Sequence, residues 1–439
     1  MKYDLFFKLA KEAGIEECEL YIRQSYSLSF SLFHSEIDNY SNNNGYAIIA
    51  RGKINGKAGV ASADVWSKEK AAYLVREIKA NAKVIENEDP VFIFPGSPKY
   101  KKVNTFNKDL ENVSIDTKMA KLFELEKEIK AYDGKISEVQ TVEYSETREI
   151  VTILNSNGLK LSQKSNYYVY VGAAVGKLGD QVKSGYDLIL DNDFSKADMK
   201  ALAAKVGKCT IEQLGGEACD TAVYKAVLSP DVVHSLLSAY LDNASAEEVQ
   251  KKSSLFIGKL GQKVASSKLT VEDRPLMKNL FARWFDDEGV ATYNKSVIKN
   301  GVLQTYLHSL TTAAKEGCET TGNGFGSGKK TPGFAYTWVK PGKKTREQLF
   351  EEVENGVFIT EVSGLHAGLN AQSGNFSLQS SGFLIKDGKK DRGLDIITIS
   401  GNLVDLFKDV IEVGSDSEEF PSAISCPSLL IKKIAVSGK

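Results

Sequence analysis

The four histidines of this chain are the first residues to test for metal chemistry: His34, His234, His308 and His366. A zinc hydrolase needs two histidines on one face of a helix and a glutamate beside the first, which activates the metal-bound water. His234 lies in a segment expected to be helical, but Ser235 stands where the glutamate would be. The positions four and five residues after His234 hold Ser238 and Ala239. Of the zinc motif, only His234 is present.

The helix expected around His234 predicts a structural role for this imidazole. Its apolar face consists of Val232, Val233, Leu236, Leu237, Tyr240 and Leu241. His234 falls at the edge of that face, where a histidine with one hydrogen-bonded ring nitrogen is more common than a metal ligand. We therefore expect no metal ligand and no catalytic residue on this helix.

Cysteine chemistry is the next alternative. The five cysteines are Cys18, Cys209, Cys219, Cys318 and Cys426. They are odd in number and form no CxxC pair, which is typical of a reduced cytoplasmic protein. Cys426 precedes an expected closing strand over 429–436, and we expect its thiol to be buried. A cysteine protease needs an imidazole beside the thiol, and a dyad of Cys426 with His366 is the alternative.

Two further segments contain residues that can bind ions or phosphate. The carboxylates of Asp286, Asp287 and Glu288 could hold a hard cation, although an acidic turn before a strand over 290–298 explains them better. Residues 322–330 resemble a phosphate loop at first sight. However, Asn323 occupies the first glycine position and Lys330 replaces the serine or threonine that contacts magnesium. We expect a flexible or closely packed loop there, lining a channel for peptide.

The size and charge of the chain exclude several classes of protein. With 439 residues it is long enough for two domains. Its 56 lysines and arginines against 57 aspartates and glutamates give no field that would attract DNA or an acidic membrane. Charges interrupt residues 1–12, which predicts an amphipathic helix rather than a signal peptide. No apolar run reaches the roughly 18 residues of a membrane span, and we expect a cytoplasmic protein.

The elements of residues 1–220 predict a mixed α/β domain with antiparallel strands and flanking helices. Strands are expected over 25–33, 46–50, 139–154 and 160–175, and helices over 67–82, 116–131 and 196–214. Turns are expected at 42–45, 55–56 and 155–158, because each contains Asn followed by Gly. A proline-rich crossing loop is expected over 89–103.

Residues 221–439 predict a strand-rich domain. A strand over 222–228 leads to Ser229 and Pro230, which suit the N-cap and first turn of a helix ending near Leu241. After that helix, only 345–356 and 402–410 show helical signals. Residues 364–374 are too rich in glycine for a helix, and the alternation over 375–379 predicts a half-buried strand.

Several segments resemble the PmbA/TldD family, the modulators of DNA gyrase, and more closely its PmbA (TldE) branch. They are 285–292, 321–324, 341–342, 362–385 and 399–403. The resemblance implies an α/β N-terminal domain, a β-barrel-like C-terminal domain and membership of a peptide-processing complex. In that family the catalytic partner carries a zinc-binding HExxxH helix. Zinc is therefore expected only in such a partner, and this chain is expected to have no cofactor.

The resemblance also assigns expectations to particular residues. His234, Tyr240 and Cys426 lie at positions resembling the family's metal site. The residues expected to contact peptide or partner are Gly322, Asn323, Gly324, Gly364, His366, Gly368, Asn370, Gly374 and Phe376. We expect a non-catalytic subunit that binds a TldD-like metallopeptidase homologue and a peptide, with a homodimer as the alternative assembly. The competing hypotheses are a free-standing peptidase with a non-standard metal or Cys/His site and a gyrase-associated binding protein.

Overall fold

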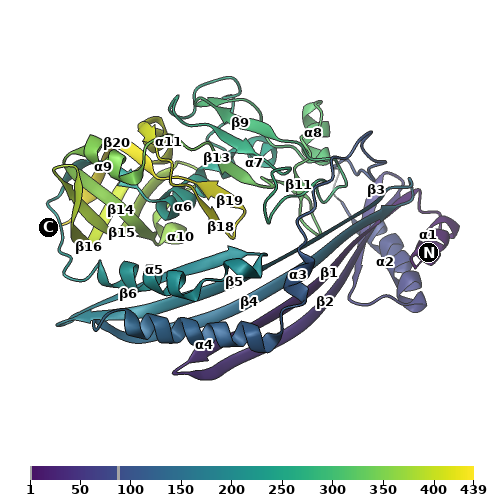
Figure 1. The fold of residues 1–439 in the computed structure, drawn as a ribbon. Coiled ribbons are helices and arrows are strands. Elements are labelled where there is room, and N and C mark those ends of the chain that lie inside the picture. The colour runs from purple at the N-terminus through teal and green to yellow at the C-terminus, as the bar shows by residue number, and fades with distance from the viewer. Residues whose placement is uncertain (1, 87–88) are drawn as a thin grey trace.

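The computed structural model of the chain describes residues 2–86 and 89–439. Its N-terminal half is built on a long, curved antiparallel sheet, called sheet A here (Figure 1). The strands follow the order β3-β2-β1-β4-β5-β6. Their bounds are β1 Glu17–Phe33, β2 Glu36–Ile54, β3 Lys57–Ala63, β4 Ile136–Asn155, β5 Lys160–Leu178 and β6 Gln181–Asp191. The expected antiparallel strands are present and are longer than the sequence pattern indicated.

The prediction of a turn at residues 42–45 is wrong. Residues 42–45 lie inside β2, where Asn42 pairs with Leu28 and Gly45 pairs with Ser25. The β1–β2 turn is formed instead by His34 and Ser35, both with positive φ. Seventeen residue pairings with β1, interrupted only by one register shift between Ser31 and Leu32, outweigh the local turn preference of the asparagines. The turns at 55–56 and 155–158 are confirmed.

Two groups of helices cover the same face of sheet A. Along β1, Leu20 and Ile22 pack with the first group, and Leu28 and Phe30 pack with the second. All four positions are even, and alternate residues of a strand share a face. The first group is α1 Asp4–Glu12 and α2 Lys68–Val84, and the second is α3 Lys108–Glu111, α4 Ile115–Tyr132 and α5 Met199–Ile211, preceded by η1 Phe194–Lys196.

The C-terminal half contains a closed barrel, which confirms the expected β-barrel-like architecture. The strands run in the order β16-β15-β14-β7-β20, and β16 pairs with β20 to close the ring. Strand β17 pairs with the same edge of β20 as β16 does, at residues 429–431 rather than 435–437. The bounds are β7 Ala222–Leu228, β14 Gly356–Ser363, β15 Asn375–Lys386, β16 Lys389–Asn402, β17 Val410–Val413 and β20 Leu429–Ser437. Helices packed around these strands are α6 Pro230–Leu241, α9 Arg346–Val353, α10 Leu365–Gly368 and α11 Leu403–Lys408.

A second sheet lies beside the barrel, in the order β10-β9-β8-β13-β19-β18. The bounds are β8 Val271–Asp273, β9 Lys295–Lys299, β10 Val302–Leu303, β13 Thr337–Val339, β18 Glu418–Phe420 and β19 Ile424–Cys426. A small pair of strands and short helices complete this region: β11 Gly324–Phe325, β12 Thr331–Pro332, η2 Asp242–Ala244, α7 Ala246–Gln250 and α8 Leu310–Glu316.

Three of these short helices, α7, α8 and α10, were not expected from the sequence. Helix α8 begins with a capping box between Ser309 and Thr312 and ends at Gly317 in the left-handed conformation. At seven residues it is too short for a hydrophobic period to be visible in the sequence. In the part of the chain that the structure describes, no helix combines the length and apolar character needed to cross a membrane.

Candidate functional site

Helix α6 places His234 at the surface of the C-terminal half. Ser229 caps this helix, since its side chain accepts a hydrogen bond from the backbone N–H of Val232, and Pro230 occupies the first turn. The Nε2 atom of His234 is hydrogen-bonded to Ser422 Oγ at 2.7 Å. The imidazole also stacks on the ring of Phe420, with centroids 4.4 Å apart. Burial lowers the pKa of His234, which favours a neutral ring.

Tyr240 and Cys426 belong to the core of the C-terminal half. The hydroxyl of Tyr240 donates to the backbone carbonyl of Val264 at 2.6 Å, and its ring packs on Phe407. The thiol of Cys426 contacts the carbonyl of Pro230 at 3.4 Å. Burial, followed by the nearby carboxylates, raises the pKa of Cys426 and favours the protonated thiol. Neither side chain is free to bind a metal.

Carboxylates from four elements gather near the start of α6. This acidic surface consists of Asp187 on β6, Asp231 on α6, Glu361 on β14 and Glu418 on β18. Burial raises the pKa of Asp231, and the carboxylates of Asp187 and Glu361 raise it further. Arg346 partly balances the charge, 3.3 Å from Glu418. Mutual repulsion of these carboxylates favours a cationic group on this surface.

The acidic turn at 286–288 is a structural junction. Asp286 accepts hydrogen bonds from the backbone N–H groups of Glu288, Val290 and Gly324, at 2.9–3.0 Å. Glu288 accepts one from the N–H of Leu310 at 2.7 Å. Burial and the neighbouring Glu288 raise the pKa of Asp286 well above its ordinary value. These carboxylates satisfy buried donors of the surrounding loops, so the acidic turn needs no cation to explain it.

The loop at 322–324 is equally well packed. Asn323 is fully buried, and its amide donates to Asp273 Oδ2 at 2.7 Å and to the carbonyl of Gly333 at 2.8 Å. Its oxygen accepts from Lys295 Nζ at 3.0 Å. A side chain at Gly324 would collide with Glu288, because a Cβ atom there would lie 2.1 Å from Glu288 Oε2. Close packing therefore accounts for this glycine.

The loop at 364–376 is partly exposed. Gly364, His366 and Asn370 face solvent, whereas Phe376 is buried in the barrel core. Gly374 is buried and has a φ of +75°. A Cβ atom at Gly368 would lie 2.3 Å from the carbonyl of Ser377, so only glycine allows this approach.

Cys426 and His366 do not form the Cys–His dyad that the sequence suggested as an alternative. His366 makes no hydrogen bond or ion pair within the described residues, while Cys426 is buried against α6. A thiol and an imidazole meet instead at Cys318 and His308, with Sγ 3.8 Å from Nε2. Burial raises the pKa of Cys318 and lowers that of His308, so both groups are neutral rather than a thiolate–imidazolium pair. No sequence motif marks this contact.

A buried ionic network joins sheet A to the C-terminal half, and sequence reasoning missed it. Arg51 on β2 donates to Glu19 on β1 at 2.7 Å. Tyr21, also on β1, donates to Asp287 at 3.1 Å. Lys330 lies 4.2 Å from the centre of the Tyr21 ring. Burial and the positive charge of Arg51 lower the pKa of Lys330 from 10.5 to about 8. Positions far apart in the sequence form this network, and no spacing signal links them.

Comparison with known proteins identifies the family that shares this architecture. The PmbA/TldA metallopeptidase central domain matches residues 108–223, and the C-terminal domain of the same metallopeptidases matches residues 221–438. The chain belongs to the PmbA/TldD family. A relative from Buchnera aphidicola, the metalloprotease PmbA homolog, is 27% identical over 98% of this chain and 95% of its own length.

Solved structures of PmbA/TldD proteins share the whole fold. A Thermotoga maritima protein named as a modulator of a DNA gyrase is 29% identical, with a TM-score of 0.92 over 99% of both chains. TldE from Thermococcus kodakarensis has a TM-score of 0.93 over 100% of both chains and 24% identity, which supports the shared fold.

The zinc site implied by the PmbA/TldD family does not fit the residues of α6. Ser235 cannot act as a general base, and Ser238 and Ala239 supply no imidazole. Tyr240 and Cys426 are committed to backbone carbonyls. Among the described residues, no three His, Cys, Asp or Glu side chains are arranged to hold a metal ion. No metal-dependent step can be derived from this chain.

Replacing His234 by alanine is expected to lower the free energy of unfolding by about 1 kcal/mol, the usual cost of one lost hydrogen bond. His366→Ala is the matched control, because this imidazole is exposed and unpaired among the described residues. It should change stability by less than about 0.5 kcal/mol. Urea denaturation measures both variants. Loss of bound zinc in His234→Ala, from a chain that had held it, would contradict the structural role.

Proposed function

We propose that this chain is a non-catalytic subunit of a peptide-processing complex, in which a TldD-like homologue with an intact HExxxH helix supplies the zinc and the catalysis. The observation that carries the proposal is α6. This helix keeps its N-terminal cap and its apolar face. However, Ser235 stands where a zinc site needs a glutamate, and Ser238 and Ala239 stand where it needs a second histidine. Loss of the ligands on a retained scaffold is expected when a homologue performs the reaction.

Two exposed features support contacts with a peptide or a partner. The acidic surface lies beside α6 and favours a cationic segment. The loop at 364–370 presents Gly364, His366 and Asn370 to solvent. We assign the partner contact to this side of the C-terminal half, with a second copy of the chain as the alternative occupant.

The test compares the isolated chain with the chain copurified with its HExxxH homologue. We expect the isolated chain to hold substoichiometric zinc and to leave an unstructured fluorogenic peptide uncleaved, while the complex cleaves it. His234→Ala in this chain should leave the activity of the complex unchanged. Alanine at the first histidine of the partner's HExxxH should abolish that activity.

Stoichiometric zinc and peptidase activity in the isolated chain would overturn the proposal and favour a free-standing peptidase. Recovery of gyrase by the chain in the absence of any peptidase homologue would instead favour the gyrase-associated hypothesis.

A further inference from the structure

The two helical groups on sheet A leave a gap between them. Strand β4 crosses this gap with Arg148 and Ile150, and β5 crosses it with Lys164, the residue paired with Ile150. Val151, the next residue along β4, packs with Trp284 of the C-terminal half. Because successive residues of a strand point to opposite faces, Arg148 and Ile150 lie on the helix-covered face, away from the C-terminal half.

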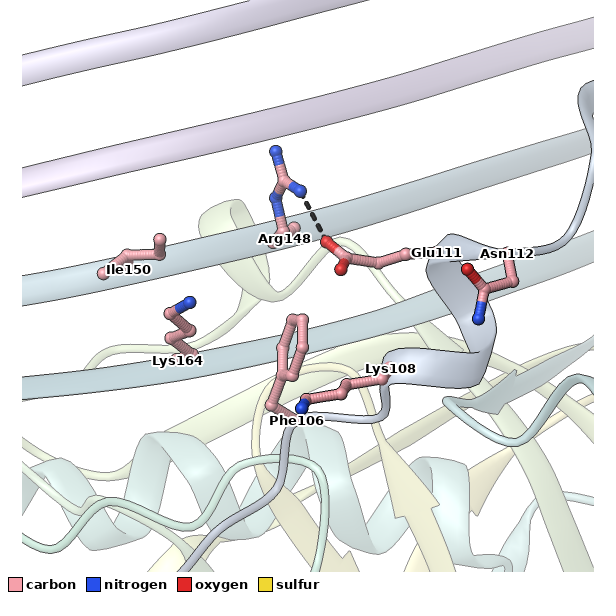
Figure 2. Close-up of a pocket in the computed structure, with 7 residues that line it drawn as sticks. All are labelled: Phe106, Lys108, Glu111, Asn112, Arg148, Ile150 and Lys164. Carbon is pink, nitrogen blue, oxygen red and sulfur yellow. Dashed lines mark hydrogen bonds and ion pairs between the residues drawn. The ribbon is translucent and has the colours of Figure 1, made fainter.

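A cavity of about 340 Å³ occupies this gap (Figure 2). Its volume lies within the range of about 300–1,000 Å³ that is usual for small-molecule sites. The lining comes from α3, the residues on either side of it, and strands β4 and β5: Phe106, Lys108, Glu111, Asn112, Arg148, Ile150 and Lys164.

The lining carries three cations and one carboxylate. Glu111 already binds Arg148, with the guanidinium nitrogen and the carboxylate oxygen 2.5 Å apart. The ammonium groups of Lys108 and Lys164 have no carboxylate partner within the described residues. The ammonium nitrogen of Lys164 lies 5.7 Å from the centre of the Phe106 ring. The cavity therefore has an excess of positive charge available to a ligand.

The apolar part of the lining narrows the choice of anion. Phe106 lies between the two lysines, and Ile150 lies beside Lys164 on the neighbouring strand (Figure 2). A small hydrophilic dianion such as phosphate would leave these two apolar side chains uncovered. A carboxylate carried on an apolar group would pair with the ammonium groups and bury its apolar part against the two side chains.

We propose that this cavity binds the C-terminal residue of a peptide, with the α-carboxylate on Lys108 and Lys164 and an apolar side chain against Phe106 and Ile150. Asn112 adds a neutral donor to the same lining. The site is independent of the proposed subunit role, because it lies on the opposite face of sheet A from the C-terminal half.

The experiment measures binding of an N-acetylated alanine peptide that ends in leucine, by isothermal titration with the full chain. The free C-terminal carboxylate should bind at least tenfold more tightly than the same peptide with a C-terminal amide, because the amide loses the charge-assisted hydrogen bonds. Inorganic phosphate is the third ligand, and we expect it to bind more weakly than the carboxylate peptide.

Lys108→Met and Lys164→Met should each weaken binding of the carboxylate peptide about tenfold. Lys200→Met, which removes an exposed lysine of α5, is the matched control and should leave the affinity unchanged. Equal binding of the amide and the carboxylate, no binding of either, or tighter binding of phosphate would each overturn the proposal. Equal loss of affinity in the Lys200 control would overturn it as well.

Discussion

Replacing Arg51 by methionine is expected to lower the free energy of unfolding by about 3–5 kcal/mol, the usual cost of removing one partner of a buried ion pair. Glu19 is fully buried and receives two hydrogen bonds from Arg51, through Nε and Nη2. Its second oxygen, Oε2, has no partner in the described residues. Without the guanidinium, the carboxylate would stay buried with no compensating charge bound to it. Denaturation by guanidinium chloride measures the decrease in the free energy of unfolding.

Two controls separate this effect from general damage to sheet A. Arg23 on β1 pairs with Glu149, but its side chain is 54% exposed. Arg23→Met should therefore cost less than about 1 kcal/mol. The double variant Glu19→Leu/Arg51→Met removes both charges and should recover most of the stability lost in the single variant. A single variant with a loss below about 1 kcal/mol would contradict the argument.

Lys330 is expected to make the chain gain stability as the pH rises from about 8 to about 10.5. The pKa of Lys330 is about 8 in the folded chain and 10.5 in its ordinary state. In that pH window the unfolded chain holds more protons at this lysine than the folded chain, so raising the pH favours the folded state. Below pH 8 both states are protonated, and the full cost of burying the charge remains. The shift corresponds to about 3–4 kcal/mol.

The measurement is the difference in unfolding free energy between the wild-type chain and Lys330→Met at several pH values. This difference should rise in favour of the wild type by about 3–4 kcal/mol across the window, because the contributions of the other titrating groups cancel. Lys329→Met is the neighbouring control, since Lys329 is 67% exposed and pairs with Glu247 at the surface. Parallel pH profiles for the wild type and Lys330→Met would contradict the prediction.

The sequence predicts the elements that depend on local signals. Ser67 and Ser229 begin α2 and α6 with side-chain caps. The edge position of His234 on α6 also predicts its single hydrogen bond, to Ser422. Such features follow from residues within one or two helical turns, so no knowledge of distant segments is needed.

The features that the sequence did not predict depend on distant contacts. The asparagines at 42–44 favour a turn locally, yet pairing with β1 makes them part of a strand. The sequence predicts a loop at Asn323, but the side chain is buried and hydrogen-bonded to Asp273, Gly333 and Lys295. The network around Lys330 joins β1 and β2 to a loop about 300 residues away in the sequence, and only the fold brings these charges together.

Closure of the barrel limits how a peptide or partner can engage the loop at 364–370. Strand β15 pairs with β14 on one side and β16 on the other. Beyond the end of β14, the loop itself pairs with the start of β15. Leu369 pairs with Phe376, and the N–H of Asn370 donates to the carbonyl of Asn375. An extended peptide therefore finds no vacant strand position there. Recognition at this loop must depend on side chains, so discrimination between partners would respond to substitution at His366 and Asn370.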